Sequence, residues 1–423
     1  MKVLVLGSGG REHALVWKLC QDKSVTDLYC LPGSDAIAAI ARTIPGNPSD
    51  PETVLAAARA IQADLVVVGP EAPLFAGVTD ALREKGVAVF GPSRAAAAIE
   101  GSKAFAKDFM ARHHIPTARY GVFRDFAGAA AFIRTLGGPA VVKASGPALG
   151  KGVVVADDEK TALEAAEAML VKEAFGAAGQ EIVVEERLEG EEVSFLVITD
   201  GERVLPLLAA QDHKRIGDGD TGPNTGGMGA ICPVPWWTPA LQEQVTERVI
   251  KPALAGLRAE GRPYSGVLYA GLMVTRNGPA VLEFNARFGD PETQPLLRLL
   301  DANIGELFYQ VAQGRLEKEG VDWYKGASAG IVIAAAGYPG EYRRGDVIEG
   351  LEAAARVPGV TVFHAGTRRE GDRWLTNGGR VLNVVARGRD LPSALASAYR
   401  ACALIHWPGM QYRRDIGRRA LSF

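Results

Sequence analysis

The sequence predicts a multidomain protein of the α/β and α+β classes, in which a doubly wound parallel sheet comes first and antiparallel sheets follow. A length of 423 residues is too great for one ordinary hydrophobic core, so three or four lobes are expected. Short apolar runs alternate with helical stretches over residues 2–90, which is typical of a parallel sheet. Farther along, Asn277-Gly278 separates two apolar runs, which favours an antiparallel hairpin.

The composition is that of a soluble globular protein, with 47% hydrophobic and 23% charged residues. A net charge of -2 gives no general attraction to nucleic acid or to a membrane surface, so neither is expected as a partner. No window approaches the roughly 18 apolar residues of a membrane span, and the first apolar run is too short for a signal peptide. The 4 cysteines are scattered and suggest neither a zinc cluster nor a disulfide framework, which favours a cytoplasmic protein.

Residues 1–101 are predicted to form a Rossmann-like substrate-binding domain. An apolar run breaks at the glycine turn 7–12 and helical spacing then resumes, so free N–H groups at the helix start can attract an anion. Glu12 stands where a dinucleotide fingerprint has its third glycine, so a phosphate-bearing substrate is favoured over NAD, and a structural turn is the alternative. At another strand end, Glu71 is either a ribose hydroxyl acceptor or a helix cap.

Residues 102–326 are expected to form a second domain, with an α+β lid lobe at about 120–192. A helix is predicted to run to Arg112 with Ser102 as its N-cap. In the lid, a strand bearing Lys143, a glycine-rich loop and a returning strand could close over the phosphates of a nucleotide. A β-branched run follows Lys151 in place of a helix, so this is not a Walker loop, and an ordinary hairpin is the alternative.

Two polar stretches follow the lid loop. The strand at 181–186 leads into clustered carboxylates, which fits either a solvated edge or a slot for adenosine. The segment 211–229 is so rich in glycine and polar residues that a long loop without regular structure is expected. Within it, Lys214 and Arg215 could neutralise a phosphate and Asp212 could hold an ammonium group, with a plain surface turn as the alternative.

A short strand at 281–285 carries the predicted metal site. Glu283 and Asn285 are two residues apart, so both side chains face the same side of the strand. Carboxylate and amide oxygens are ligands that magnesium prefers. Arg287, Asp290 and Glu292 follow in a turn and add a guanidinium group and two carboxylates. A surface strand with a solvated turn is the alternative.

Residues 327–423 are expected to form a C-terminal domain. Strands are predicted at 329–335, 360–365 and 381–386, and a helix at 391–405. The end of the chain is rich in arginine, which we interpret as a solvated face.

The order of these motifs resembles that of the ATP-grasp ligases, and more narrowly that of the phosphoribosylamine-glycine ligases, also called glycinamide ribonucleotide synthetases. The motifs that carry the narrower resemblance are Gly9-Gly10-Arg11-Glu12-His13-Ala14, Val68-Gly69-Pro70-Glu71-Ala72-Pro73, Gly101-Ser102-Lys103, Gln211-Asp212-His213-Lys214-Arg215, Asn224-Thr225-Gly226-Gly227-Met228-Gly229, Arg287-Phe288-Gly289-Asp290-Pro291-Glu292 and Thr376-Asn377-Gly378-Gly379-Arg380-Val381. Each motif alone is weak, but together and in this order they are a strong signal.

The resemblance implies an ATP-grasp fold and an enzyme of de novo purine synthesis. Such an enzyme joins glycine to 5-phosphoribosylamine and converts ATP to ADP and phosphate, with magnesium or manganese as the metal. The glycine carboxylate would attack the γ-phosphate to form glycyl phosphate, and the ribosylamine nitrogen would then displace phosphate. Catalysis of the first step is mostly positioning and charge neutralisation.

The resemblance also implies roles for individual residues. ATP is expected to contact Lys103, Lys143, Gly150, Gly152, Glu185, Glu186, Leu188 and Glu192. Phosphoribosylamine is expected to contact Gly10, Arg11, Glu12, Glu71, Asp212, His213, Lys214, Arg215, Thr225, Gly226 and Gly227. The metal is expected on Glu283 and Asn285, and the anionic substrate or transferred phosphoryl group on Arg287. The expected catalytic residues are Arg287 and Lys143, together with Asp212 and Asp290 as candidates for holding the ammonium group of glycine.

The sequence departs from the family pattern in the lid loop, where Ser145 replaces an aspartate and Pro147 a leucine. Pro147 fixes its own φ, which bears on how the lid closes and leaves the identity of the family unaffected. Many ATP-grasp enzymes have a further metal carboxylate shortly before the Glu-x-Asn pair, and residues 267–273 offer none. Two alternatives remain: an ATP-grasp carboxylase that uses bicarbonate, and a nucleotide-binding regulatory protein without turnover. A monomer or a weak oligomer is expected.

Overall fold

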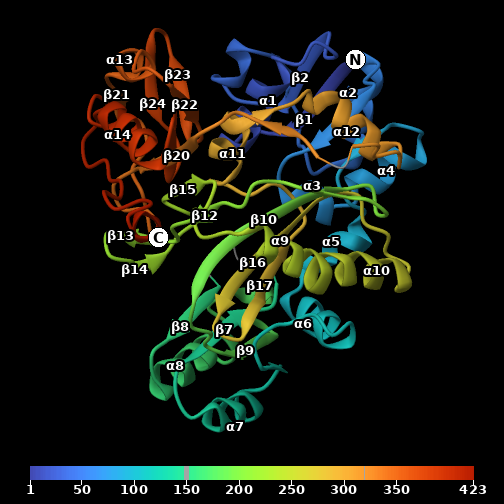
Figure 1. The fold of residues 1–423 in the computed structure, drawn as a ribbon, viewed down its shortest axis with the longest axis vertical. Helices are drawn as coiled ribbons and strands as arrows, with labels where there is room; N and C mark the ends of the chain where they lie inside the picture. Colours follow the sequence, from blue (N-terminus) through green and yellow to red (C-terminus); the bar gives the residue numbers. More distant parts are fainter. Residues whose placement is uncertain (147–151, 319) are drawn as a thin grey trace.

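The computed structural model describes residues 1–146, 152–318 and 320–423 (Figure 1). In Figure 1 the N-terminal lobe lies at the top, the C-terminal lobe at the upper left and the lid lobe at the bottom, with a long antiparallel sheet between them. Within the described ranges, no helix combines the length and the apolar character that a membrane crossing requires.

The N-terminal lobe is built on a 5-stranded parallel sheet of order β3-β2-β1-β4-β5, as the sequence predicts. Alternate residues of β1 enter two different cores, since Leu4 and Leu6 pack on one face of the sheet and Val3 and Val5 on the other. The strands are β1 Lys2–Gly7, β2 Asp27–Pro32, β3 Arg42–Thr43, β4 Leu65–Val68 and β5 Val89–Phe90. The helices are α1 Gly10–Leu19, η1 Ile37–Ala39, α2 Pro51–Ile61, α3 Glu71–Phe75, α4 Val78–Glu84 and α5 Arg94–Gly101.

The lid lobe is a 4-stranded antiparallel sheet of order β6-β9-β7-β8. Helices α7 and α8 bury their alanine-rich sides against it, and Asp125 and Asp158 cap their N-termini. The elements are β6 Tyr120–Phe123, α7 Phe126–Leu136, β7 Ala140–Ala144, β8 Val153–Ala156, α8 Glu159–Leu170, η2 Gly176–Gly179 and β9 Ile182–Glu186. Helix α6, Lys103–Arg112, leads into this lobe and begins at the predicted N-cap, because the Ser102 side chain accepts a hydrogen bond from the N–H group of Phe105.

The sheet between the lobes has the order β11-β10-β16-β17, and β16 pairs antiparallel with β17 as the Asn277-Gly278 turn predicts. Its strands are β10 Glu191–Thr199, β11 Val204–Pro206, β16 Gly266–Thr275 and β17 Gly278–Asn285. The helix expected at 239–260 consists of α9 Pro239–Val245, a π-helical turn η3 Thr246–Ile250 and α10 Lys251–Ala259. After β17 come α11 Thr293–Leu299, β18 Leu300–Asp301, α12 Ile304–Ala312 and β19 Asp322–Trp323.

The prediction of a long irregular loop at 211–229 is wrong. The segment contains β12 Gln211–Asp212, the hairpin strands β13 Arg215–Gly217 and β14 Thr221–Asn224, and the start of β15 Gly229–Cys232. Strands β12 and β15 join a 5-stranded sheet of order β12-β15-β20-β25-β22, whose other strands come from the C-terminal lobe. Glycine and polar residues signal a turn, but backbone pairing with a neighbouring strand still makes a strand of such a segment.

The C-terminal lobe covers that sheet with α14 and adds a 3-stranded sheet of order β21-β24-β23. Its elements are β20 Ala327–Ala334, β21 Val347–Ile348, α13 Leu351–Ala355, β22 Val360–His364, β23 Thr367–Glu370, β24 Arg373–Thr376, β25 Arg380–Gly388, α14 Leu391–Cys402 and η4 Arg419–Ser422.

Candidate functional site

A cleft of about 520 Å³ lies where the N-terminal lobe, the lid lobe, the sheet between them and the C-terminal lobe meet. The residues of the predicted site that line it are Arg11, Glu71, Lys103, Lys143, Gly152, Glu185, Asp212, Lys214, Thr225, Gly226, Glu283, Asn285, Arg287 and Asp290. These residues come from segments that are far apart in the sequence. The fold therefore brings most of the expected site to one place.

Other predicted site residues do not line this cleft. Glu12 turns back onto its own helix start, where it accepts hydrogen bonds from the N–H group of Gly9 at 2.7 Å and from Arg11 at 2.6 Å. Glu186 accepts a hydrogen bond from the N–H group of Arg119, and Glu192 pairs with Lys214 at 3.0 Å. Gly10, Leu188, His213, Arg215 and Gly227 also lie outside the lining.

Two of the predicted site residues outside the lining, His213 and Gly227, make other contacts, and Gly150 lies outside the described residues. His213 accepts a hydrogen bond through Nε2 from the N–H group of Gly417, so its ring faces the C-terminal tail. Gly227 has φ +109°, and a side chain there would meet Pro291, so only glycine fits between this loop and the turn after β17. Gly150 falls in the segment 147–151, outside the described residues.

Strand β17, which carries the two predicted metal ligands, contains an irregularity that the sequence did not reveal. Glu283 is paired with Gly271 but Val281 with Leu272, so Leu282 is an extra residue, as in a β-bulge. The Leu282 carbonyl accepts a hydrogen bond from Lys143 at 3.2 Å. The bulge thus ties the lid strand β7 to the strand that carries Glu283.

The two predicted metal ligands suit a hard cation. The carboxylate of Glu283 and the amide of Asn285 both line the cleft, and oxygen donors of these types are what magnesium prefers. Burial raises the pKa of Glu283, but the ammonium groups of Lys214 and Lys143 outweigh this and hold the pKa below its usual value. Over the described ranges, no group of three or more His, Cys, Asp and Glu residues could hold a metal. The protein would therefore supply two oxygens, and waters and phosphates the others.

Arg287 is held between two carboxylates from the N-terminal lobe. Its Nε lies 3.2 Å from Glu71 Oε2 and its Nη2 lies 3.0 Å from Glu100 Oε1. Burial alone would lower the pKa of Arg287, but Glu100 and Glu71 raise it, so the group stays cationic. The sequence reasoning missed Glu100, although it directly precedes the Gly101-Ser102-Lys103 motif.

The C-terminal lobe contributes residues that the sequence reasoning also missed. Arg380 pairs with Asp290 at 3.3 Å and donates to the carbonyl of Asp290 at 2.8 Å, and Tyr338 accepts a hydrogen bond from the N–H group of Gly226. Burial raises the pKa of Asp290, but Arg380 and Arg11 outweigh it and lower the pKa. Arg380 stands in a motif of the resemblance, which was the available signal.

The pKa of Asp212 is shifted upward, in the opposite direction from that of Asp290. Burial raises its pKa to about 7, and Glu292 adds to this rise while Lys214 opposes it. Glu292 itself accepts hydrogen bonds from Tyr269 at 2.5 Å and from Ser194 at 3.0 Å. The two candidates for binding the ammonium group of glycine therefore differ. Asp290 is already paired with Arg380, whereas Asp212 lies near other carboxylates, such as that of Glu292.

A buried group of charges lies at the base of the cleft between α6, β7 and β9. Glu185 is within 2.8 Å of the ammonium groups of both Lys107 and Lys143. Burial raises the pKa of Glu185, but the two lysines outweigh it and lower the pKa. Burial lowers the pKa of Lys107 to about 8, with Glu185 opposing the change, so Lys107 is cationic at neutral pH. Lys107 was not predicted, although it lies one helical turn after Lys103.

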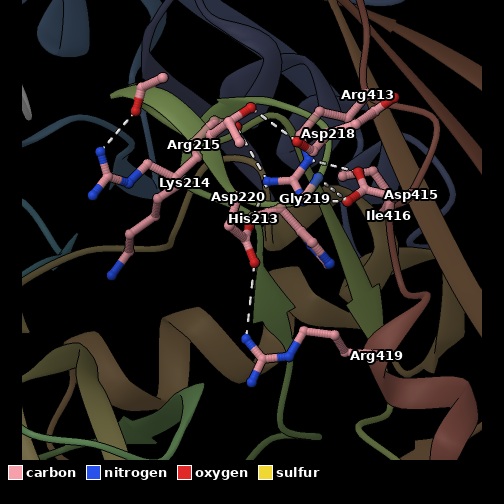
Figure 2. A network of polar contacts seen from close by, with 12 residues as sticks. His213, Lys214, Arg215, Asp218, Gly219, Asp220, Arg413, Asp415, Ile416 and Arg419 are labelled. Atoms are coloured by element: carbon pink, nitrogen blue, oxygen red, sulfur yellow. Dashed lines mark hydrogen bonds and ion pairs between the residues drawn. The ribbon is translucent and has the colours of Figure 1, made fainter.

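The interpretation of the arginine-rich end of the chain as a solvated face is wrong for Arg413. Its side chain is only 1% exposed and forms a two-point ion pair with Asp415, while Nη1 reaches Asp220 at 2.7 Å (Figure 2). Figure 2 also shows the exposed side chain of Arg419 pairing with Asp220. The network joins the C-terminal tail to the β13–β14 hairpin, a long-range pairing that local composition does not reveal.

Comparison with known families identifies the family of the chain. The chain matches three domains described for phosphoribosylglycinamide synthetase: the N domain over residues 1–100, the ATP-grasp (A) domain over 101–293 and the C domain over 328–419. The phosphoribosylamine–glycine ligase of Vibrio cholerae serotype O1 is 49% identical over 425 residues, which cover 100% of this chain and 99% of that protein. The ligase of the same name from Allochromatium vinosum is 50% identical, with the same coverage.

Solved structures show the same relationship. The phosphoribosylamine–glycine ligase of Thermotoga maritima has a TM-score of 0.86 and 33% identity, and the match covers 98% of this chain and 100% of that one. A biotin carboxylase from Campylobacter jejuni, 17% identical with a TM-score of 0.72 over 97% of this chain and 92% of that one, shares the fold. The chain therefore belongs to the phosphoribosylamine-glycine ligase family and has the ATP-grasp fold.

Proposed function

We propose that the cleft around β17 is where this chain, as a member of that family, joins glycine to 5-phosphoribosylamine at the expense of ATP. The observation that carries the proposal is that Lys103, Lys143, Glu283, Asn285 and Arg287 all line one cleft between lobes. Two lysines, one arginine and a pair of oxygen ligands are what is needed to gather a nucleotide and a carboxylate for acyl-phosphate chemistry.

In this proposal the cations of the cleft hold the reacting anions. Lys103 and Lys143 contact the phosphates of ATP, and Arg287 contacts the glycine carboxylate or the transferred phosphoryl group. Glu283 and Asn285 hold magnesium, or manganese in its place, which supplies charge neutralisation at the phosphates when bound. The glycine carboxylate attacks the γ-phosphate, ADP leaves, and the amine of phosphoribosylamine then displaces phosphate from glycyl phosphate. Attack by a neutral amine on an acyl phosphate needs no strong general base.

The remaining substrate contacts follow the lobes that form the cleft. Glu185, at the end of β9, lies at the slot for adenine, and the lid strands β7 and β8 cover the phosphates. Phosphoribosylamine lies toward the N-terminal lobe and the segment after β12, with Arg11, Glu71 and Lys214 as its contacts in the cleft. Asp212 and Asp290 are the candidates for the ammonium group of glycine.

A substrate-omission assay tests the proposed function. ADP formation is measured with ATP, magnesium, glycine and freshly prepared phosphoribosylamine, and then with each component left out in turn. We expect full turnover only with all of them. Turnover that requires bicarbonate in place of glycine would identify a carboxylase, and ATP binding without any turnover would identify a regulatory protein.

We further propose that the chain acts in the cytoplasm as a monomer or weak oligomer, with neither nucleic acid nor membrane as a partner. The support is its net charge of -2 and its free cysteines at positions 20, 30, 232 and 402. Light scattering over a range of protein concentrations measures the oligomeric state, and a constant mass above that of one chain would contradict this part of the proposal.

A further inference from the structure

Lys107 is a buried cation in the lining of the cleft that the proposed reaction does not use directly. Its side chain is 3% exposed, its Nζ lies 2.8 Å from Glu185 Oε2, and it donates a hydrogen bond to the Thr117 hydroxyl at 2.6 Å. That hydroxyl in turn donates to the carbonyl of Val281 at 2.6 Å. Lys107 is therefore fixed with respect to both β9 and the strand that carries Glu283.

The same carboxylate also holds Lys143. Glu185 is 2% exposed, and its Oε1 lies 2.8 Å from Lys143 Nζ, so each carboxylate oxygen has one lysine. Two lysines and one glutamate give the group a net charge of +1. If Glu185 had Lys143 as its only partner, the pair would be neutral, and the positive charge offered to a nucleotide from this position would be lost.

In the proposed reaction, the phosphates of ATP and the carboxylate of Glu185 compete for the Lys143 ammonium group. When that group turns toward the phosphates, its contact with Glu185 weakens. A buried carboxylate that loses its only cation is strongly unfavourable, because desolvation is then not offset. With Lys107 in place, Glu185 keeps a partner after Lys143 has moved.

We propose that Lys107 is a positioning residue for ATP binding: it holds the charge of Glu185, so that Lys143 stays available to the phosphates. This inference rests on the proposed function. Lys107 acts through Glu185 and touches no reacting atom. Its effect is therefore specific for the nucleotide and does not extend to glycine.

Three substitutions separate charge from packing at this position. Lys107→Gln keeps a hydrogen-bond donor but removes the charge, Lys107→Met keeps the length of the side chain without either, and Lys107→Arg keeps the charge. In steady-state kinetics we expect Gln and Met to raise the KM for ATP about tenfold, the size of a single close charge interaction, with the KM for glycine unchanged. The Arg variant should remain within about threefold of the parent chain.

Lys18 provides a matched control. It is also a buried lysine, 6% exposed, but its Nζ donates to the carbonyl of Leu300 at 2.5 Å and it does not line the cleft. Lys18→Gln should lower the melting temperature without changing the KM for ATP. If Lys107→Gln behaves in the same way, Lys107 is only structural and the inference is overturned.

A double variant gives the sharpest result. In Lys107→Met with Glu185→Gln, the carboxylate that needed the second cation is gone, so the KM for ATP should fall severalfold below that of Lys107→Met alone. Additive losses in the double variant would overturn the inference. If Lys107→Met does not fold, the Gln and Arg variants still decide, since they differ in charge. Failure of the parent chain in the omission assay would refute the proposed function itself, which is a distinguishable result.

Discussion

Two buried groups of charges in this molecule are built in opposite ways. In the cleft, Glu185 is shared by Lys107 and Lys143, which leaves an excess of positive charge. Beneath the C-terminal tail, Arg413 is shared by Asp415 and Asp220, and its Nη1 also donates to the carbonyl of Arg215 at 3.2 Å. Here the guanidinium group makes four hydrogen bonds within the protein and is only 1% exposed, so it serves structure.

The difference shows how burial of charge serves two purposes. A buried guanidinium group that donates to several acceptors fixes segments that are distant in sequence, in this case the tail and the β13–β14 hairpin. A group with unbalanced charge is less favourable for stability alone, and it is retained where a ligand supplies the missing counter-charge. Substitutions in the cleft should therefore affect catalysis, and substitutions in the tail network should affect unfolding.

The largest effect is expected for Glu283→Ala. The loss of the carboxylate from the metal strand should lower kcat on the order of a thousandfold, because charge neutralisation at the phosphates is the main catalytic contribution. The melting temperature should change little, since Glu283 lies in the cleft lining. Turnover is measured as ADP release over a range of magnesium concentrations. A variant with the parental rate at low magnesium would refute the metal assignment.

The second largest effect is expected for a substitution in the C-terminal tail, and it concerns the free energy of unfolding. Arg413→Met leaves the carboxylate of Asp415, which is 16% exposed, without its two-point partner, while Asp220 is 44% exposed and keeps Arg419. We expect a loss of about 2–3 kcal/mol in the free energy of unfolding. Denaturant unfolding measures this loss. Arg413→Lys should recover only part of it, because lysine cannot form the two-point pair with Asp415. A loss of activity without a loss of stability would show that the tail network serves the cleft.

The sequence predicted the cleft better than the tail, for a physical reason. Glu283 and Asn285 share a face because of the two-residue period of a strand, and Ser102 caps α6, both of which are local rules. Strand and helix alternation likewise predicted the parallel sheet of the first lobe. The Arg413–Asp220 pair joins residues 193 positions apart, and no local pattern contains that information, although the other partner, Asp415, is only 2 positions from Arg413.

The cleft residues that the sequence analysis did not predict differ in how far a local pattern could have indicated them. Lys107 is one turn after Lys103 and faces the same way, so helical spacing could have indicated it. Arg380 comes from the C-terminal lobe and pairs with Asp290, which depends on how the lobes pack. The extra residue at Leu282 is a register shift against β16, which the alternation of residues along β17 alone cannot show. The assignments of substrate contacts stay predictions.

A third buried site, formed by the uncharged histidines His13 and His364, extends the comparison to the dependence of stability on pH. His13 accepts a hydrogen bond through Nδ1 from the N–H group of His364, across the contact between the N- and C-terminal lobes. Burial lowers the pKa of His13 to about 4 and that of His364 to about 3. Both values lie below the unfolded value near 6.5, so the unfolded chain binds more protons in this range.

Stability should therefore be constant above about pH 6.5 and fall as the pH decreases toward 4, by about 1.4 kcal/mol per pH unit for each histidine. Chemical denaturation at a series of pH values measures the slope. In His13→Asn, whose side-chain oxygen can accept the same hydrogen bond, the slope should fall by roughly a third, because His364 and also His213, whose pKa burial lowers to about 4, remain. An unchanged slope would mean that other groups cause the loss of stability in acid.

The smallest effect is expected for Arg419→Ala, which removes two ion pairs of an exposed side chain, one with Asp220 and one with Glu191. Arg419 and Arg413 both pair with Asp220, but the Arg419 side chain is 63% exposed and its pair distance is 3.8 Å, against 1% and 2.7 Å for Arg413. An exposed ion pair contributes at most about 1 kcal/mol, and salt screens it within about 10 Å at 0.1 M. The loss of stability in Arg419→Ala should thus be small and should vanish at high salt, whereas the loss of stability in Arg413→Met should persist. Similar losses for both would mean that Asp220, and not burial, determines the strength of the network.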